Sequence, residues 1–551
     1  MSNFTETSSR PFTGGASRVA HIGVILILAF IVRTIGITWG MPNKYHVTTY
    51  NCDEYTMLIS LQGMNPSKLD FNPVSEKDPW ALGNGTFPLY TYAAMIKALS
   101  MTGWITLTGD KEFYYQNIEE WNKFFLVGRL LSVFYGVLTV WLIYLLAGKM
   151  YGQRTALLSA LFMACMPAHA VYSRYMLANG PGIFWIVLAF CFLKSIIDTG
   201  RTRDYFLVGM SAGLAIATRY SAAPLIPMII LAHFMNADPL KNIKKLALGL
   251  LASFLFFLAV SPYAILDYRN FLKGLGIVKY LSTGGSEQFM LFKNIAAVSS
   301  QATEALGVFL FLLCLAGIAV ALAKRKRYDI LLLSWILPML IIFIKAGNTA
   351  LAGRILPALP FMAVLGARSL DLAWDRKPTA AKIMLAAILA HAALFYCASF
   401  KLILSRDIRD AASEWMIGNI KPGSSIGLVR EPSWFNPGII DRKYRHPDHR
   451  QLPDYKFIPL AGGDFRSVIG YDRLGEVKPD FVIASDVETG PLPEPDFLEA
   501  LNGYGYREIK KFENRFSVLN FKTGNHVPAM LFVPDHIYVF EKANDPVVKS
   551  R

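Results

Sequence analysis

The sequence has few charged residues for its length. Asp, Glu, Lys and Arg make up 17% of the 551 residues, whereas soluble domains usually contain about 25%. Hydrophobic residues make up 53%, and nearly all of the long apolar runs lack a carboxylate. This composition excludes an ordinary soluble protein and predicts an integral membrane protein.

Cysteine is also scarce, and the five cysteines cannot form a disulfide framework. Cys165, Cys191, Cys314 and Cys397 fall inside apolar runs, so Cys52 is the one thiol that we expect to face outward. No cluster of cysteines and histidines has the spacing of a zinc site. We therefore predict no metal site and no cofactor, and keep a divalent metal open as an alternative.

The chain has an excess of positive charge, with a formal net charge of +15. In a soluble protein this excess would suggest a nucleic-acid partner. Here much of it lies in short loops between apolar runs, where membrane orientation and anionic lipid headgroups explain it better. We therefore predict membrane lipid, and no nucleic acid, as a partner.

About eleven apolar runs have the length of a membrane span. The first follows Arg10 and Arg18, contains Arg33 and ends without a cleavage site, so we interpret it as a retained helix and not as a signal peptide. The predicted spans are 19–40, 124–147, 155–172, 178–198, 204–219, 221–237, 245–265, 303–323, 329–345, 350–370 and 380–404.

Basic residues occur in every second loop when the N-terminus is placed in the cytoplasm, as the positive-inside rule requires. The predicted cytoplasmic connections contain Lys149 and Arg154; Arg201 and Arg203; Lys241, Lys244 and Lys245; Lys324, Arg325, Lys326 and Arg327; and Arg368, Arg376 and Lys377. An odd number of spans then places the C-terminal part outside. We expect a multi-pass protein of the plasma (inner) membrane.

This topology divides the chain into three parts. Residues 1–18 form a cytoplasmic N-terminus, residues 19–404 form a multi-span catalytic domain, and residues 405–551 form a small extracytoplasmic α/β domain. The first outer loop, 41–122, contains juxtamembrane helices. In the last part we expect a helix over 407–420 and short strands at 425–429, 481–485, 516–519 and 536–540.

An acidic pair, Asp53-Glu54, follows the first span on the predicted outer face. A carboxylate at this surface is suited to act as a general base on a lipid-borne substrate. The alternative is purely structural, because acidic residues in the first turn of a helix interact favourably with its macrodipole. Asp70, Glu76 and Asp78 in the same outer loop are competing candidates for the base.

Three arginines lie at predicted outer helix ends: Arg174, Arg219 and Arg354. Each one taken alone is explained equally well as a helix anchor that reaches the interface. Three on the face that carries Asp53 favour an anionic ligand, and the arginine fork suits phosphate because it donates two parallel hydrogen bonds.

These residues together resemble the lipid-phosphate-sugar-dependent glycosyltransferases of the C-type membrane fold (GT-C fold), and among them the protein-mannosyltransferase and aminoarabinose-transferase group. The resemblance extends over roughly residues 20–400 and rests on the order of several short motifs. They are Gly40-Met41-Pro42, Asp53-Glu54, Asn65-Pro66, Arg129-Leu130-Leu131-Ser132, Ser173-Arg174-Tyr175, Gly213-Leu214, Thr218-Arg219-Tyr220, and Arg354 with Pro357 and Pro360.

The resemblance implies transfer of a sugar from a polyprenyl-phosphate donor to a protein, lipid or polysaccharide acceptor at the outer face. Asp53 would be the general base of an inverting displacement, and Glu54 would position Asp53 or the acceptor. Arg354 and Arg219 would hold the lipid phosphate, with Arg174 and Lys345 as further candidates. Where family members often carry an aspartate after the Ser173-Arg174-Tyr175 turn, this chain reads Leu177-Ala178-Asn179-Gly180-Pro181, which weakens the case for a divalent metal.

Two other functions stay open from the sequence. A secondary transporter usually has polar or broken helices near the membrane midplane and often repeated halves, whereas the polar groups here gather at one surface and no repeat is evident. A non-catalytic membrane scaffold would use the outer domain to bind partners, and its acidic pair and arginines would be ordinary helix-end charges.

Overall fold

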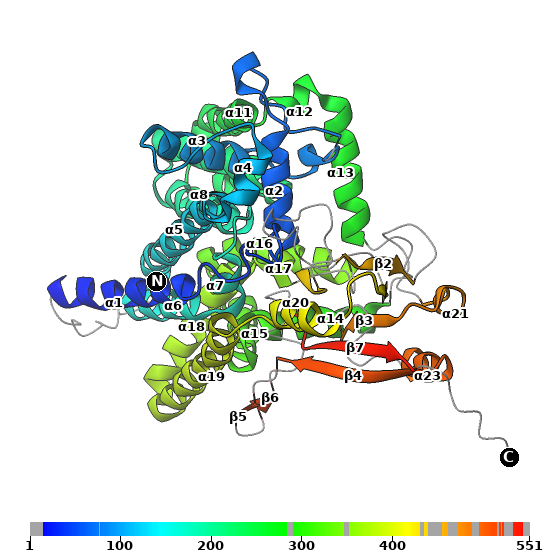
Figure 1. Ribbon diagram of the computed structural model, residues 1–551. Helices are drawn as coiled ribbons and strands as arrows, with labels where there is room; N and C mark the ends of the chain where they lie inside the picture. The colour runs from blue at the N-terminus through cyan, green and yellow to red at the C-terminus, as the bar shows by residue number, and fades with distance from the viewer. Residues whose placement is uncertain are drawn as a thin grey trace.

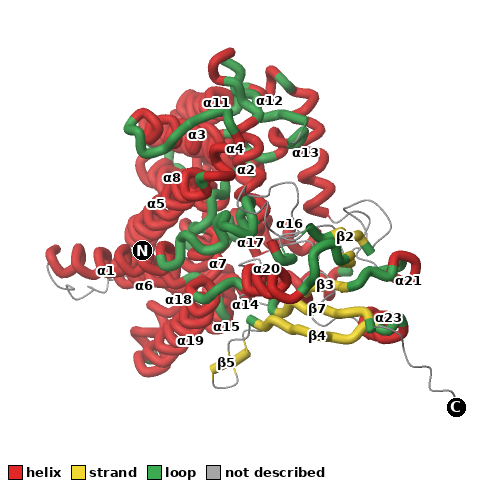
Figure 2. The backbone as a smooth tube through the Cα atoms, in the orientation of Figure 1, coloured by secondary structure: helices red, strands yellow, loops and turns green. Residues whose placement is uncertain are grey.

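The computed structural model places a large helical part before a small sheet domain (Figure 1). In Figure 2 most of the strands gather at the lower right, and the rest of the described chain is mainly helices joined by loops. The structure describes residues 15–76, 78–283, 290–346, 352–429, 435–438, 454–460, 471–486, 495–514, 517–518, 521–522 and 533–543.

The helical part contains α-helices and short 3₁₀ turns in the following order: α1 (Gly15–Thr34), α2 (Cys52–Gln62), η1 (Pro66–Lys68), η2 (Ala81–Gly83), α3 (Phe87–Met101), α4 (Lys111–Gln116), α5 (Ile118–Tyr151), α6 (Gln153–Cys165), α7 (Pro167–Tyr172), α8 (Asn179–Thr199), α9 (Thr202–Thr218), η3 (Tyr220–Ala222), α10 (Leu225–Phe234), η4 (Leu240–Asn242), α11 (Ile243–Val260), α12 (Tyr263–Leu266), α13 (Tyr268–Thr283), α14 (Leu291–Leu306), α15 (Val308–Lys324), α16 (Arg327–Ala346), α17 (Ala352–Ile355), α18 (Leu359–Arg376) and α19 (Pro378–Leu404).

The expected membrane character is confirmed, whereas the count of eleven spans stays a prediction. Within the described residues, five helices are long and apolar enough to cross a membrane, or six if α14 and α15, which meet at a bend of 114°, form one broken span. The other predicted spans coincide with shorter helices. For example, α9 has 17 residues and ends at Thr218, just before Arg219, and α10 has 10 residues and begins after Pro224.

Small residues allow the helices to pack closely. Gly209 and Gly213 are one helical turn apart on α9, the arrangement that brings membrane helices into near backbone contact. A Cβ atom added at Gly209 would lie 2.2 Å from the carbonyl oxygen of Gly249 on α11. Substitution of either glycine would therefore push α9 and α11 apart.

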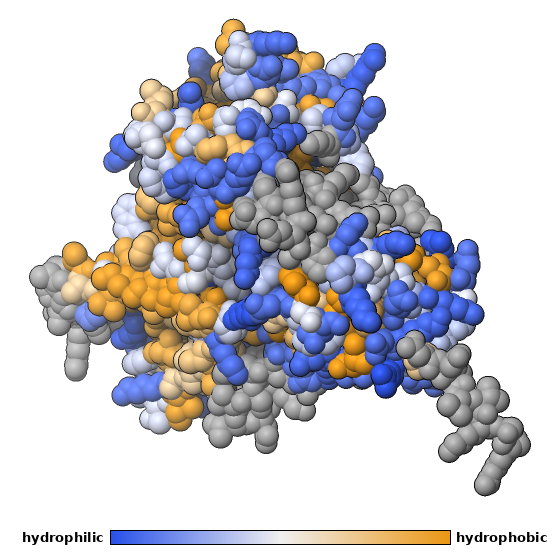
Figure 3. All heavy atoms as spheres, viewed as in Figure 1, coloured by the Kyte–Doolittle hydropathy of each residue, from blue (hydrophilic) through white to orange (hydrophobic). Residues whose placement is uncertain are grey.

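Apolar side chains gather on one side of the helical part. In Figure 3 they cover α1 and the helices next to it, while the sheet domain at the lower right is mostly hydrophilic. Arg33, near the end of α1, is fully buried and donates hydrogen bonds to the Ala29 and Ala164 carbonyl groups at 2.8 and 3.2 Å. Its charge is therefore satisfied within the protein and not by snorkelling.

The C-terminal domain is an α/β unit, as expected. Its helices are α20 (Ile408–Asn419), α21 (Leu474–Val477) and α23 (Pro495–Gly503), and its strands are β1 (Ser425–Leu428), β2 (Lys456–Pro459), β3 (Phe481–Ser485), β4 (Tyr506–Glu513), β5 (Ser517–Val518), β6 (Phe521–Lys522) and β7 (His536–Lys542). The main sheet has the order β2-β1-β3-β7-β4. Strand β1 is parallel to β2 and β3, and β7 is antiparallel to β3 and β4.

Four of the predicted elements of this domain occur near their expected positions, namely α20, β1, β3 and β7. The segment 516–519 contains β5, which pairs with β6 in a separate hairpin, and its two end residues lie outside the described part. The edge strands β2 and β4 were not expected. Strand β4 alternates poorly and exposes charged side chains, a common feature of edge strands that removes the usual sequence signal.

A buried polar network joins α20 to the loop before α2. Asp410 accepts hydrogen bonds from the Tyr50 hydroxyl and, at 2.9 Å, from the Asn43 amide. The Arg409 guanidinium lies 3.4 Å from the centre of the Tyr50 ring. The His46 ring stacks on the Tyr50 ring, with the two ring centres 4.1 Å apart. The C-terminal domain is thus attached three residues before Asp53.

His46 should make this attachment sensitive to pH. Burial lowers its pKa below the ordinary value of about 6.5, even though Asp410 acts in the opposite direction. The unfolded chain therefore binds a proton that the folded chain resists, and stability falls as the pH drops through about 6.5, by up to about 1.4 kcal/mol per pH unit. Unfolding of the purified protein across pH, compared with His46→Gln, should show a steeper acid loss for the wild type. Equal slopes would contradict this assignment.

Candidate active site

The acidic pair lies at the start of α2, as predicted. The Asn51 side chain caps the helix by accepting a hydrogen bond from the Asp53 backbone N–H at 3.1 Å. Because successive residues of a helix point in different directions, the two acids have different environments: Asp53 is exposed, whereas Glu54 is completely buried.

Glu54 forms a buried bidentate ion pair with Arg129 of α5. The Nε and Nη2 atoms of Arg129 donate to the two carboxylate oxygens at 2.8 and 2.7 Å. Arg129 Nη1 also donates to the carbonyl oxygens of Ile37 and Trp39, at 2.6 and 2.7 Å. The Met176 backbone N–H donates to Glu54 Oε1 at 2.8 Å. Glu54 therefore holds four segments of the chain together.

Asp53 belongs to a separate polar cluster built from the ends of several helices. Its carboxylate interacts electrostatically with Arg219, at the end of α9, and with Tyr172, at the end of α7. Arg219 also interacts electrostatically with Arg354 on α17. Tyr172 likewise interacts electrostatically with Glu304 on α14. Helix α14 contacts both α7 and α17, which brings these side chains to one place.

Two contacts fix the positions of the arginines. Arg219 Nη1 donates a hydrogen bond to the Asn179 side-chain oxygen at the start of α8. The Gly353 backbone forms a hydrogen bond with the Tyr172 hydroxyl, and a Cβ atom at Gly353 would lie only 3.0 Å from that oxygen. Glycine therefore lets α17 approach Tyr172 closely and places Arg354 next to the cluster.

The structure brings together three of the six predicted site residues: Asp53, Arg219 and Arg354. Arg174 instead faces α1, where it is nearly buried and donates to the Ile35 carbonyl oxygen at 2.5 Å. Lys345 lies exposed in the last turn of α16, just before residues 347–351, which are outside the described part. Glu54, as described above, is engaged with Arg129.

Sequence reasoning did not assign roles to Tyr172, Asn179 and Glu304. Tyr172 directly precedes the Ser173-Arg174-Tyr175 motif and Asn179 was noted as a departure, so both had a local signal. Glu304 had none, because it lies in a polar stretch of α14 far from any motif. Of the competing acids, Asp78 is buried and accepts a 2.5 Å hydrogen bond from Ser60.

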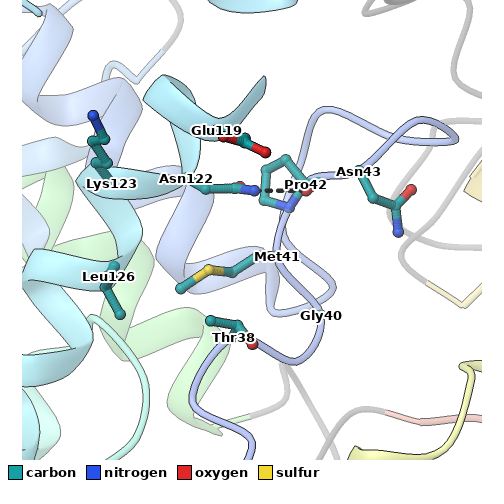
Figure 4. Close-up of a pocket in the computed structure, with 9 residues that line it drawn as sticks. All are labelled: Thr38, Gly40, Met41, Pro42, Asn43, Glu119, Asn122, Lys123 and Leu126. Atoms are coloured by element: carbon teal, nitrogen blue, oxygen red, sulfur yellow. Dashed lines mark hydrogen bonds between the residues drawn. The ribbon is translucent and has the colours of Figure 1, made fainter. Parts of the chain in front are cut away.

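The described residues contain no group of three or more His, Cys, Asp or Glu side chains placed to hold a metal ion. A separate hollow lies between the loop after α1 and the start of α5 (Figure 4). It is bordered by Met41, Glu119 and Lys123, and the Asn122 amide donates to the Pro42 carbonyl oxygen across it at 3.0 Å. This hollow contains none of the residues of the Asp53 cluster.

The middle of the chain matches a known family. Residues 122–265 match the family described as dolichyl-phosphate-mannose-protein mannosyltransferase. ArnT from Cupriavidus metallidurans, solved bound to undecaprenyl phosphate, has a similar structure with a TM-score of 0.51 and 12% sequence identity, over 97% of this chain and 99% of that chain. The chain has the GT-C fold.

An archaeal enzyme is also among the similar solved structures. The archaeal oligosaccharyltransferase AglB from Archaeoglobus fulgidus, in complex with an inhibitory peptide and a dolichol-phosphate, is 12% identical over 92% of this chain and 74% of its own, with a TM-score of 0.47. No curated protein matches the chain in sequence. The resemblance inferred from the motifs is confirmed, and the family match supports the expected enzyme class, a glycosyltransferase.

The two adjacent acids of this GT-C chain should respond differently to neutralisation. Glu54→Gln leaves the Arg129 charge buried without its partner, so we expect a loss of about 3–5 kcal/mol in the free energy of unfolding. Asp53→Asn, the matched control, should change it by about 1 kcal/mol or less, because Asp53 is exposed. Denaturant unfolding in detergent measures both. A stable Glu54→Gln protein would argue against a structural role.

Proposed function

We propose that the chain is an inverting glycosyltransferase that moves a sugar from a polyprenyl-phosphate donor to an acceptor at the outer membrane face. The juxtaposition of the exposed Asp53 with Arg219 and Arg354, at helix ends far apart in sequence, carries this proposal.

The proposed topology has eleven spans with the N-terminus in the cytoplasm and residues 405–551 outside. A polyprenyl-phosphate donor is compatible with the similar structure of ArnT, which was solved bound to undecaprenyl phosphate.

In the proposed reaction an acceptor hydroxyl or amine attacks the anomeric carbon of the donor sugar. The bond between that carbon and the phosphate oxygen breaks, and the phosphate leaves with the electron pair. Asp53 accepts the proton of the acceptor. Because the acceptor attacks the anomeric carbon directly, no glycosyl-enzyme intermediate is needed. Arg219 and Arg354 stabilise the negative charge that develops on the leaving phosphate, because fixed guanidinium groups need no reorganisation.

The other predicted residues take supporting roles. Glu54 positions Asp53 by fixing the start of α2 to Arg129, and we do not expect it to touch the substrate. Arg174 stabilises the junction between α1 and the turn after α7. Lys345, at the rim beside α17, is a further candidate for contact with the lipid phosphate. Tyr172 supports the site by holding Gly353 and therefore Arg354 in place.

Asp53→Asn should reduce sugar transfer by about 10²–10⁴-fold, the usual contribution of a general base. Transfer from a panel of labelled polyprenyl-phosphate sugars to a membrane extract measures this in the purified protein, and binding of the donor should persist. Asp70→Asn is the matched control, since Asp70 lies in the same outer loop but bonds the Asn72 backbone and Tyr263. If Asp70→Asn abolished transfer and Asp53→Asn did not, the base would be misassigned.

Arg219→Gln and Arg354→Gln should each lower transfer by about 10²–10³-fold, because each removes a donor that stabilises the leaving phosphate. We expect the effect mainly in kcat, with a smaller rise in the KM for the donor, since the charge increases in the transition state. Arg269→Gln, an exposed arginine of α13 outside the cluster, is the control and should retain activity. Wild-type rates in both cluster variants would remove the arginines from the mechanism.

A further inference from the structure

A second basic site lies at the end of α5 that is far from Arg129, the partner of Glu54. It is a pocket between the end of α5, the turn that joins α15 to α16, and the end of α18. The pocket is about 33 Å along α5 from Arg129, at 1.5 Å per residue. Along α15, about 24 Å separate Val308, which follows the end of α14, from Lys324, at the pocket. In the proposed topology the two sites therefore lie at opposite membrane faces.

The lining of this pocket carries an excess of positive charge. Four cationic side chains border it, from Lys324, Lys326, Arg327 and Arg368, against one carboxylate, that of Asp371. Lys324 experiences like charge from Arg368 and Lys326. Among the described residues, no carboxylate lies within ion-pair distance of the Lys324 or Lys326 ammonium groups.

The carboxylates near the pocket already have partners. Asp371 accepts hydrogen bonds from Arg154 at 2.9 Å and from the Thr155 hydroxyl at 2.6 Å. Asp329, which is fully buried, accepts bonds from Arg368 and, at 2.8 Å, from the Tyr151 hydroxyl. The positive charge of the two lysines is therefore not neutralised by the protein.

Arg368 forms a fixed wall of the pocket. Its side chain is only 7% exposed, and its guanidinium lies 4.5 Å from the centre of the Tyr151 ring and forms an ion pair with Asp329. Basic loops that only orient a protein in the membrane need charge but no concave shape. The two lysines have no carboxylate partner among the described residues, and Arg368, whose charge is paired with Asp329, gives the pocket a rigid wall. This combination of concave shape and uncompensated positive charge suits a phosphate group.

The surroundings of the pocket favour a phosphate that belongs to a lipid. Met150 and Leu372 line the same pocket as the cations. Leu322 on α15 and Ile330 on α16 are 44% and 41% exposed, and both lie within a helical turn or two of the basic residues. Apolar surface next to a basic pocket between membrane helices matches the two chemical parts of an anionic phospholipid.

We propose that this pocket, defined by Lys324, Lys326 and Arg368, binds the phosphate of an anionic phospholipid in the leaflet opposite the Asp53 cluster. The site is independent of the proposed transfer reaction, because none of its residues belongs to the Asp53 cluster. Its occupation would stabilise the junction of α5, α15 and α18.

The test is binding of fluorescently labelled phosphatidylglycerol to the purified full-length protein in detergent, with labelled phosphatidylcholine as the neutral lipid. We expect saturable binding of phosphatidylglycerol that Lys324→Gln/Lys326→Gln weakens about tenfold to thirtyfold, since each lysine near an anionic lipid contributes about fivefold. The matched control is Arg325→Gln/Lys377→Gln, which removes two exposed charges at the same membrane face but outside the pocket lining. Because these two charges are exposed to solvent outside the pocket and are therefore screened, this control should weaken binding less than about twofold.

Several results would overturn the proposal. Equal binding of the two lipids would show that phosphate charge is not recognised, and an equal loss in both double variants would show that the charge acts diffusely. Saturable binding of inorganic phosphate without binding of phosphatidylglycerol would support the anion site but refute the lipid as its ligand. All four substituted residues are exposed, and unchanged circular dichroism and melting would confirm that the variants are folded.

Discussion

The buried ion pair between Glu54 and Arg129 is the interaction on which the rest of the candidate site depends. Removing two charges from water is costly, and the attraction between them offsets this cost only when the geometry is good and the remaining polar atoms are satisfied. Both conditions hold here. Arg129 Nη1 donates hydrogen bonds to the carbonyl oxygens of Ile37 and Trp39, and the Glu54 carboxylate accepts a hydrogen bond from the Met176 backbone N–H. The pair thereby fixes α2 against α5, the end of the first helix and the turn at Met176.

This arrangement gives two adjacent carboxylates different environments. Glu54 is a fixed point inside the protein, whereas Asp53 is one residue away at the surface and interacts electrostatically with Arg219. The start of α2 is fixed from the other side as well, because Tyr50 is bonded to Asp410 of the C-terminal domain. The C-terminal domain is therefore attached to the chain only three residues before Asp53.

The sequence predicted what depends on local pattern and composition. The start of α2, the placement of Asp53, Arg219 and Arg354 in one cluster, and the strands β1, β3 and β7 follow from capping, helix ends and apolar runs. The partner of Glu54 did not follow, because Arg129 is 75 residues away and only tertiary packing joins them. Glu304 and the charged edge strand β4 gave no usable signal, and short helices such as α9 and α10 made the number of spans unreliable.

The charge balance of the cluster bears on why Asn179 suits the proposed reaction. An amide oxygen satisfies the geometry of Arg219 by accepting a hydrogen bond, but it does not neutralise the guanidinium charge. An aspartate at this position would add a carboxylate to a site that already contains Asp53 and Glu304, and would compete with an incoming phosphate for the same cation. Because electrostatic stabilisation depends on charge that is oriented but not yet compensated, a neutral partner keeps Arg219 rigid and still leaves its attraction available to the leaving phosphate.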